Sequence, residues 1–196
     1  MSQRRRRGGG RHQQEPAHDS PAAAGPAADP LAVARKIVLD QLAAAPRTRA
    51  QLEAALAKRD VPEEAGRAVL DRFTELGYID DAAFARSWVA SRSAGRGLGR
   101  RALAQELRTR GVAAETVAAT LDDLDPTASE QAVRRLVARK LAGTRGLDPA
   151  VRLRRVAGML ARKGHAPGAA LQFAREGLAA EGAEPADDDA PSAVED

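Results

Sequence analysis

The sequence contains no cysteine and few aromatic residues: one Trp, one Tyr and three Phe. Without a thiol, the chain can form neither disulfides nor thiolate zinc sites, which is consistent with a reducing compartment. It has no run of about twenty apolar residues that could cross a bilayer. Its arginine-rich start also lacks the apolar segment of a secretory signal. We therefore expect a cytoplasmic protein that does not bind a membrane.

Side chains that could build an active site or a metal centre are also scarce. The three histidines are His12, His18 and His165, and no two of them share a helical face. No serine has a nearby base, and no glycine-rich loop ends in Gly-Lys-Ser or Gly-Lys-Thr. The stretch GRGLG follows a predicted helix instead of a strand, which argues against a dinucleotide site. We expect no catalytic residue, no cofactor and no metal ligand.

The two ends of the chain differ in composition from its middle. Residues 1–29 include five arginines and almost no large apolar side chain, and residues 178–196 include seven carboxylates and no base. Such segments bury too little apolar surface to offset the entropy of ordering. We predict a disordered basic arm over 1–29 and a disordered acidic tail over 178–196.

Between these ends, a unit of about fifty residues occurs three times. The segment LAKRDVPEEAGRAVL from Leu56 matches LRTRGVAAETVAATL from Leu107 at an offset of 51, and LARKGHAPGAALQFA from Leu160 at a further 53. A unit this small buries too little surface to be very stable alone, so the copies are expected to stack. We place the three units at residues 30–79, 80–125 and 126–177.

Each unit contains three short segments with apolar residues at helical spacing, and no segment alternates as a strand does. We predict that helices end near Gly77, Gly143, Gly164 and Gly177, and that a flexible loop covers SAGRGLG, residues 93–99. The fold class is therefore all-α. It should consist of three tandem three-helix, helix-turn-helix-like repeats in an elongated, curved stack.

The stretch LGYIDDAAFARSWVASR contains the only Tyr and the only Trp. Asp80 and Asp81 stand where a helix begins, where carboxylates accept backbone N–H groups and favour the positive end of the helix dipole. Phe84 and Trp88 share a helical face, and we expect them to pack with Tyr78 at the joint between the first two units. The alternative is a base-stacking platform for single-stranded nucleic acid, but the arginines follow the aromatics instead of alternating with them.

This stretch, the glycine-bearing loop and the segment RRALAQELRTRGV resemble the signature region of the bacterial RecX family, regulators of the RecA recombinase. The likeness extends over about Pro30 to Gly177 and includes the threefold repeat. Arg100 departs from the family, whose members often have proline or serine there. The residues that carry the signature are Tyr78, Asp80, Asp81, Phe84, Trp88, Leu103, Leu107 and Gly111.

The resemblance implies binding instead of catalysis. It implies a cytoplasmic monomer that lies in the groove of the RecA–DNA filament and limits filament extension, ATP hydrolysis and strand exchange in recombination, DNA repair and the SOS response. The RecA filament is then the main partner, with single- or double-stranded DNA as a secondary one.

Basic charge is concentrated in two zones of the chain. Residues 126–177 contain eleven bases and three acids, and residues 84–112 contain seven arginines and one glutamate. A basic surface suits nucleic acid or an acidic protein, although a merely solvated surface is an alternative. The expected RecA- or DNA-binding residues are Arg92, Arg96, Arg100, Arg101, Arg108, Arg135, Arg139, Arg152, Arg155, Arg162 and Lys163.

Two other functions stay open. A three-helix unit can place a recognition helix in the major groove, which would make the protein a helix-turn-helix-like transcriptional regulator. Two features argue against such a regulator. No third helix begins with a base-reading set of Asn, Gln and Arg, and the basic charge spreads over two units. The other possibility is a helical scaffold.

Overall fold

The computed structural model describes residues 29–183, and every regular element in this part of the chain is an α-helix, as predicted. The predicted basic arm, apart from Asp29, and residues 184–196 of the predicted tail lie outside it. The helices are α1 (Pro30–Ala44), α2 (Arg49–Ala57), α3 (Glu63–Glu75), α4 (Asp81–Arg96), α5 (Arg100–Thr109), α6 (Ala114–Asp122), α7 (Pro126–Ala142), α8 (Pro149–Arg162) and α9 (Pro167–Ala183).

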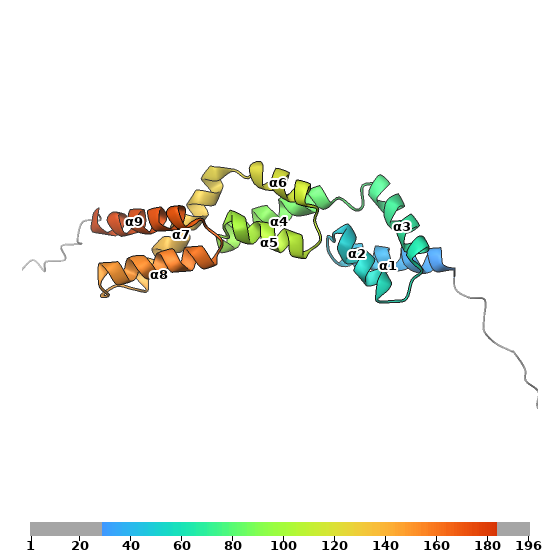
Figure 1. Cartoon of the computed structure of the whole chain (residues 1–196), viewed down its shortest axis with the longest axis horizontal. Coiled ribbons are helices and arrows are strands. Elements are labelled where there is room, and N and C mark those ends of the chain that lie inside the picture. Colours follow the sequence, from blue (N-terminus) through green and yellow to red (C-terminus); the bar gives the residue numbers. More distant parts are fainter. Residues whose placement is uncertain (1–28, 184–196) are drawn as a thin grey trace, which may run out of the picture.

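Consecutive helices form three groups of three, which we call units 1, 2 and 3, and the units follow one another along an elongated molecule (Figure 1). Each unit encloses its own apolar core. The cores are centred on Val38, Leu52 and Leu70 in unit 1, on Val89, Leu103 and Leu107 in unit 2, and on Leu141, Val156 and Leu160 in unit 3. The apolar positions that reveal the repeat are thus the ones that fill each core.

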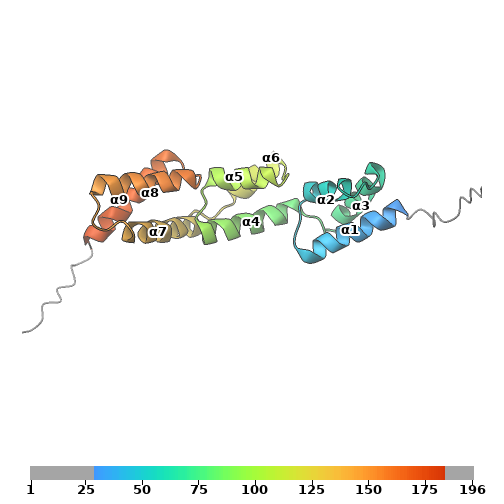
Figure 2. The same cartoon turned by 90° about the horizontal axis from the view of Figure 1, so that it is seen from below.

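Corresponding helices of the three units lie in rows. Figure 2 shows α1, α4 and α7 along one edge of the molecule and α2, α5 and α8 along the opposite edge. Side chains on α5 and α8 can therefore contribute to one long side of the stack.

The helix starts follow from local capping. The Asp80 carboxylate accepts a hydrogen bond from the Ala83 backbone N–H at 2.8 Å, as predicted. Asp125 and Asp148 cap α7 and α8 in the same way, and each is followed by a proline at the first helical position, where the missing N–H costs nothing. Thr48 and Gln51 form a reciprocal capping box at α2.

The prediction that the last helix ends near Gly177 is wrong, because α9 continues to Ala183. Gly177 lies inside α9 where this helix presses against α7. A Cβ atom at Gly177 would lie only 2.5 Å from Cγ1 of Val137. The glycine therefore serves close helix packing, and residues 178–183 belong to the fold instead of to a tail.

The predicted flexible loop at 93–99 is also wrong in extent. Helix α4 runs to Arg96, and Gly97 ends it with a left-handed φ of 58°. Only Gly97, Leu98 and Gly99 separate α4 from α5, and the two glycines are bonded to unit 3. The Gly99 N–H donates to the Lys163 carbonyl oxygen at 2.8 Å, and the Gly97 carbonyl oxygen lies 3.0 Å from His165 Nε2.

The two joints between units have the same construction. In each, the start of the second helix of one unit abuts the turn after the second helix of the next unit. Thr48 donates its hydroxyl to the Arg110 carbonyl oxygen at 2.6 Å in the first joint, and the Arg101 N–H donates to the Gly164 carbonyl oxygen at 3.2 Å in the second. The repeat in sequence is therefore also a repeat of the contact.

Glycine is required at the turn of both joints. Gly111 and Gly164 are equivalent in the repeat and have φ values of 78° and 88°. A Cβ atom would lie 2.3 Å from Cβ of Ala50 at Gly111, and 2.3 Å from the backbone nitrogen of Ala102 at Gly164. Unit 1 has Asp60 at this position, also in a left-handed conformation with φ 55°. No unit packs on that turn within residues 29–183, so a side chain fits there.

Candidate binding surface

Trp88 lies in a cluster of aromatic and charged side chains on unit 2. Its indole Nε1–H donates to Glu106 Oε2 at 2.7 Å, and the Phe84 ring stacks 5.8 Å from it. The guanidinium carbons of Arg110 and Arg92 lie 3.6 Å and 4.1 Å from the centre of the indole ring, within the range of cation–π attraction. Arg92, predicted as a binding residue, is thus partly covered by the fold.

Tyr78 does not pack with Phe84 and Trp88, contrary to our expectation. Its ring pairs with Phe73 of α3 at 5.7 Å, and the residue is 66% exposed. The segment between α3 and α4 places Ile79 in the core of unit 1 instead. The neighbouring Tyr78 side chain is then directed outward.

We predict that Trp88→Ala lowers the free energy of unfolding by roughly 3 kcal/mol, because it removes the packing against Phe84 and both guanidinium contacts. Trp88→Phe keeps an aromatic ring and loses the bond to Glu106, so it should cost about 1 kcal/mol. Urea unfolding of both variants measures the difference. A loss from Trp88→Ala below about 1 kcal/mol, typical of a free surface position, would contradict this packing.

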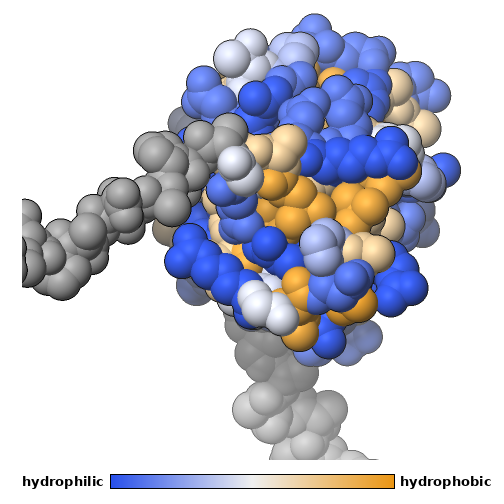
Figure 3. Space-filling view, turned by 90° about the vertical axis from the view of Figure 1, so that its left-hand side faces the viewer, coloured by the Kyte–Doolittle hydropathy of each residue, from blue (hydrophilic) through white to orange (hydrophobic). Residues whose placement is uncertain are grey.

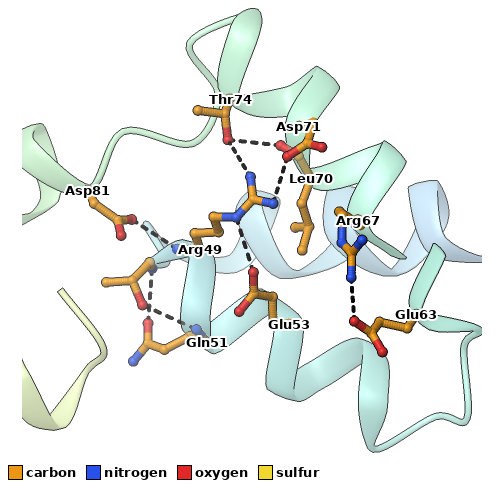
Figure 4. A network of polar contacts seen from close by, with 10 residues as sticks. Arg49, Gln51, Glu53, Glu63, Arg67, Leu70, Asp71, Thr74 and Asp81 are labelled. Atoms are coloured by element: carbon orange, nitrogen blue, oxygen red, sulfur yellow. Dashed lines mark hydrogen bonds and ion pairs between the residues drawn. The ribbon is translucent and has the colours of Figure 1, made fainter. Parts of the chain in front are cut away.

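A polar network fixes unit 1 to unit 2 (Figure 4). The Arg49 N–H donates to Asp81 Oδ1 at 2.9 Å across the joint, and its guanidinium binds Asp71 at 2.7 Å and Glu53 at 3.1 Å. Partial burial lowers the pKa of Arg49, but the hydrogen bonds and charges of these two carboxylates outweigh it and raise the pKa overall. Asp81 therefore joins two units, a role that its position in the sequence does not reveal.

Three predicted arginines border a groove of about 660 Å³ at the second joint, which we call the α5–α9 groove. Arg100, Arg101 and Arg108 come from α5, and apolar side chains of α6, α7 and α9 form its floor, among them Leu121 and Phe173. Arg100 is tied back to the Leu121 carbonyl oxygen and to Asp122. Arg101 and Arg108 are exposed and have no carboxylate partner within the described residues.

Unit 3 carries a second basic site of about 630 Å³, the α7–α8 cleft, lined by Lys140, Val151, Arg154, Arg155 and Arg162. The four cations are exposed. Arg155 and Arg162 were predicted as binding residues, whereas Lys140 and Arg154 were not. Seen end-on, unit 3 shows hydrophilic side chains around a smaller apolar area (Figure 3).

Two predicted residues, Arg152 and Lys163, are half-buried and bind neighbouring segments of the fold. The Arg152 side chain is only 14% exposed and pairs with Glu181 of α9. It also donates to the Leu141 carbonyl oxygen at 3.1 Å. Lys163 donates through Nζ to the Arg96 carbonyl oxygen at 2.7 Å, across the joint of units 2 and 3. A helical wheel groups both residues with Arg155 and Arg162, but Arg152 and Lys163 are only partly exposed and are bonded to other helices.

The remaining predicted residues are Arg96, Arg135 and Arg139. All three are exposed, at the end of α4 or along α7, and none lines the α5–α9 groove or the α7–α8 cleft. The structure therefore divides the predicted set instead of gathering it on one continuous face.

Other kinds of site have no support within residues 29–183. No three His, Asp or Glu side chains in this range come close enough together to hold a metal ion. None of the described helices combines the length and apolar character needed to cross a membrane.

Comparison with known proteins identifies the family. Residues 34–73 match the model of the first three-helix domain of RecX, and residues 80–121 match that of the second. The regulatory protein RecX of Streptomyces coelicolor is 55% identical over 157 residues, which cover 80% of this chain and 84% of that protein. The chain belongs to the RecX family. The RecX protein of Thermobifida fusca is 56% identical over 156 residues, again 80% of this chain and 84% of the relative.

Solved RecX structures share the fold. One RecX crystal structure superposes with a TM-score of 0.67 at 24% identity, over 76% of this chain and 73% of that one. RecX from Lactobacillus salivarius superposes with a TM-score of 0.72 at 17% identity, over 78% of this chain and 99% of that one. The all-helical RecX fold predicted from the sequence is thereby confirmed.

Proposed function

We propose that this RecX-family chain binds the RecA–DNA filament as a monomer and limits filament extension, ATP hydrolysis and strand exchange. Membership of a family of regulatory proteins supports this role. The observation that carries it is the stack itself: three similar units are joined head to tail by two glycine-dependent joints. An elongated molecule of this kind can lie along a polymer and contact successive subunits.

The α5–α9 groove is the part of the stack that we assign to RecA. Its exposed Arg101 and Arg108 stand beside apolar side chains, a combination that suits a protein surface with both carboxylates and apolar residues. A surface made only for DNA backbone would not need the apolar floor. DNA in the filament is then a secondary partner, reached by other cations such as Arg135 and Arg139.

No observation favours the transcriptional regulator. A recognition helix enters the major groove with its N-terminal residues against the bases, yet α3 begins with Glu63 and Glu64, and the first turn of α6 contains Glu115. These carboxylates would repel the phosphate backbone.

The test is the DNA-dependent ATPase activity of RecA, measured with increasing amounts of the full chain. We expect inhibition at well below one molecule per RecA protomer, because blocking a filament end or bridging protomers affects many subunits. Inhibition that requires stoichiometric protein would contradict filament control. Salt-resistant binding to a single duplex sequence, without an effect on RecA, would favour the transcriptional regulator.

A further inference from the structure

The α7–α8 cleft concentrates positive charge without neutralising it. Lys140, Arg154, Arg155 and Arg162 line the cleft, and no carboxylate does. None of the four makes an ion pair within residues 29–183. By contrast, Arg134, which is on α7 like Lys140, does make ion pairs. Its Nη2 atom lies 3.6 Å from Glu130 Oε2 and 3.5 Å from Glu176 Oε2. Like charges that line one cleft repel one another, so the cleft is suited to an anionic ligand with several charges.

We propose that the chain's own acidic segment, residues 184–196, occupies the α7–α8 cleft. This segment lies outside the described residues. It contains six carboxylates and no base in thirteen residues, and its charge is therefore opposite to that of the cleft. The carboxylates are Glu184, Asp187, Asp188, Asp189, Glu195 and Asp196.

The end of the fold places the segment beside the cleft. Glu181, in the last turn of α9, already pairs with Arg152 in the first turn of α8. Arg155 follows Arg152 by three residues and lines the cleft. The contact between α8 and the acidic part of the chain thus begins inside the described structure, and the proposed contact continues it along α8.

The length of the segment is sufficient. Thirteen residues span about 43–47 Å when fully extended. Arg154 and Arg162 are eight residues apart on α8, which corresponds to about 12 Å. Because the segment is attached next to the cleft, its effective concentration there is in the millimolar range, which favours it over a weak external anion.

The experiment compares the full chain with a full-length variant whose tail is neutralised. The probe is a fluorescein-labelled peptide of residues 184–196, and its Kd is measured by fluorescence anisotropy at low ionic strength. The substitutions are Glu184→Gln, Asp187→Asn, Asp188→Asn, Asp189→Asn, Glu195→Gln and Asp196→Asn. Neutralisation should tighten peptide binding about tenfold, because the intramolecular competitor is lost. Equal Kd values in the two proteins would overturn the proposal.

Two reversal variants locate the site in the tail-neutralised background. R154E, R155E and R162E together should abolish peptide binding. The matched control replaces Arg35, Lys58 and Arg59 with Glu. These are exposed cations of unit 1, and their replacement alters the net charge by the same amount. Equal weakening by both triple variants would mean that only net charge matters, and would overturn the assignment to the cleft.

A single-stranded oligothymidine used in place of the peptide separates the tail from nucleic acid. If the tail occupies the cleft, its neutralisation should tighten oligonucleotide binding by a similar factor. The proposal would be overturned if oligonucleotide binding depends on Arg154, Arg155 and Arg162 but is unaltered by tail neutralisation. The cleft would then be a nucleic-acid site. None of these measurements involves RecA, so their failure would leave the proposed function untouched.

Discussion

Replacing Gly164 with alanine is expected to lower the free energy of unfolding by roughly 3–4 kcal/mol. Part of this loss comes from forcing a residue with a Cβ atom into the left-handed conformation of Gly164, with φ 88°. The larger part comes from the joint, because the new atom would lie 2.3 Å from the backbone nitrogen of Ala102. Backbone cannot move aside as a flexible side chain does. Units 2 and 3 must therefore separate locally, which breaks the bond from the Gly99 N–H to the Lys163 carbonyl oxygen.

Gly146→Ala provides the matched control. Gly146 has nearly the same φ, 86°, but a Cβ atom there would meet nothing within 4 Å. The free energy of unfolding of this variant should fall only by the strain of the left-handed conformation, roughly 1–2 kcal/mol. Urea unfolding measures both values, and hydrogen exchange at the Gly99 amide reports on the joint itself. Equal losses in the two variants, with unaltered protection of Gly99, would show that the joint tolerates the methyl group.

Hydrophobic spacing predicts most of the fold because the same core positions recur. Leu56, Leu107 and Leu160 are buried at equivalent places in the three units, so self-comparison of the sequence finds the units without any structure. Helix caps such as Asp80 and Asp125 are equally local features, since each depends on residues within one turn. The all-helical architecture follows from these two kinds of information.

Glycine is ambiguous in the sequence because one residue type serves two purposes. Gly111 and Gly164 end turns in a left-handed conformation and also allow the next unit to approach. Gly177 has only the second role, inside a continuous helix. The distinction depends on which segment lies opposite, and that segment comes from elsewhere in the sequence.

The candidate site could be predicted only in part for a similar reason. A helical wheel places Arg152 beside Arg155, but it does not include α9, whose Glu181 covers Arg152. In the same way, Lys140 is remote from α8 in sequence and joins its arginines only through the packing of α7 on α8. Arg110 stacks on Trp88 although 22 positions separate them. Contacts between helices decide which cations remain available.

Replacing Arg101 and Arg108 together with Glu should raise the concentration of this protein needed for half-inhibition of the RecA ATPase roughly 30-fold. Each charge reversal replaces an attraction to an acidic surface by a repulsion. It should weaken the free energy of binding to RecA by roughly 1 kcal/mol per position. The fold should tolerate the substitutions, since both side chains are exposed and lack a carboxylate partner within residues 29–183. Circular dichroism of R101E/R108E should therefore match that of the unmodified chain.

The control R35E/R59E alters the net charge equally on unit 1, away from the α5–α9 groove, and should shift half-inhibition by no more than about twofold. Arg35 and Arg59 are exposed like the groove arginines. A similar shift in both variants would mean that long-range attraction governs binding and that the groove has no special role. Unaltered inhibition by R101E/R108E would remove the α5 side of the stack from the proposed contact with RecA. Because the second joint brings these arginines next to the apolar floor, Gly164→Ala should weaken inhibition as well if the groove is the contact site.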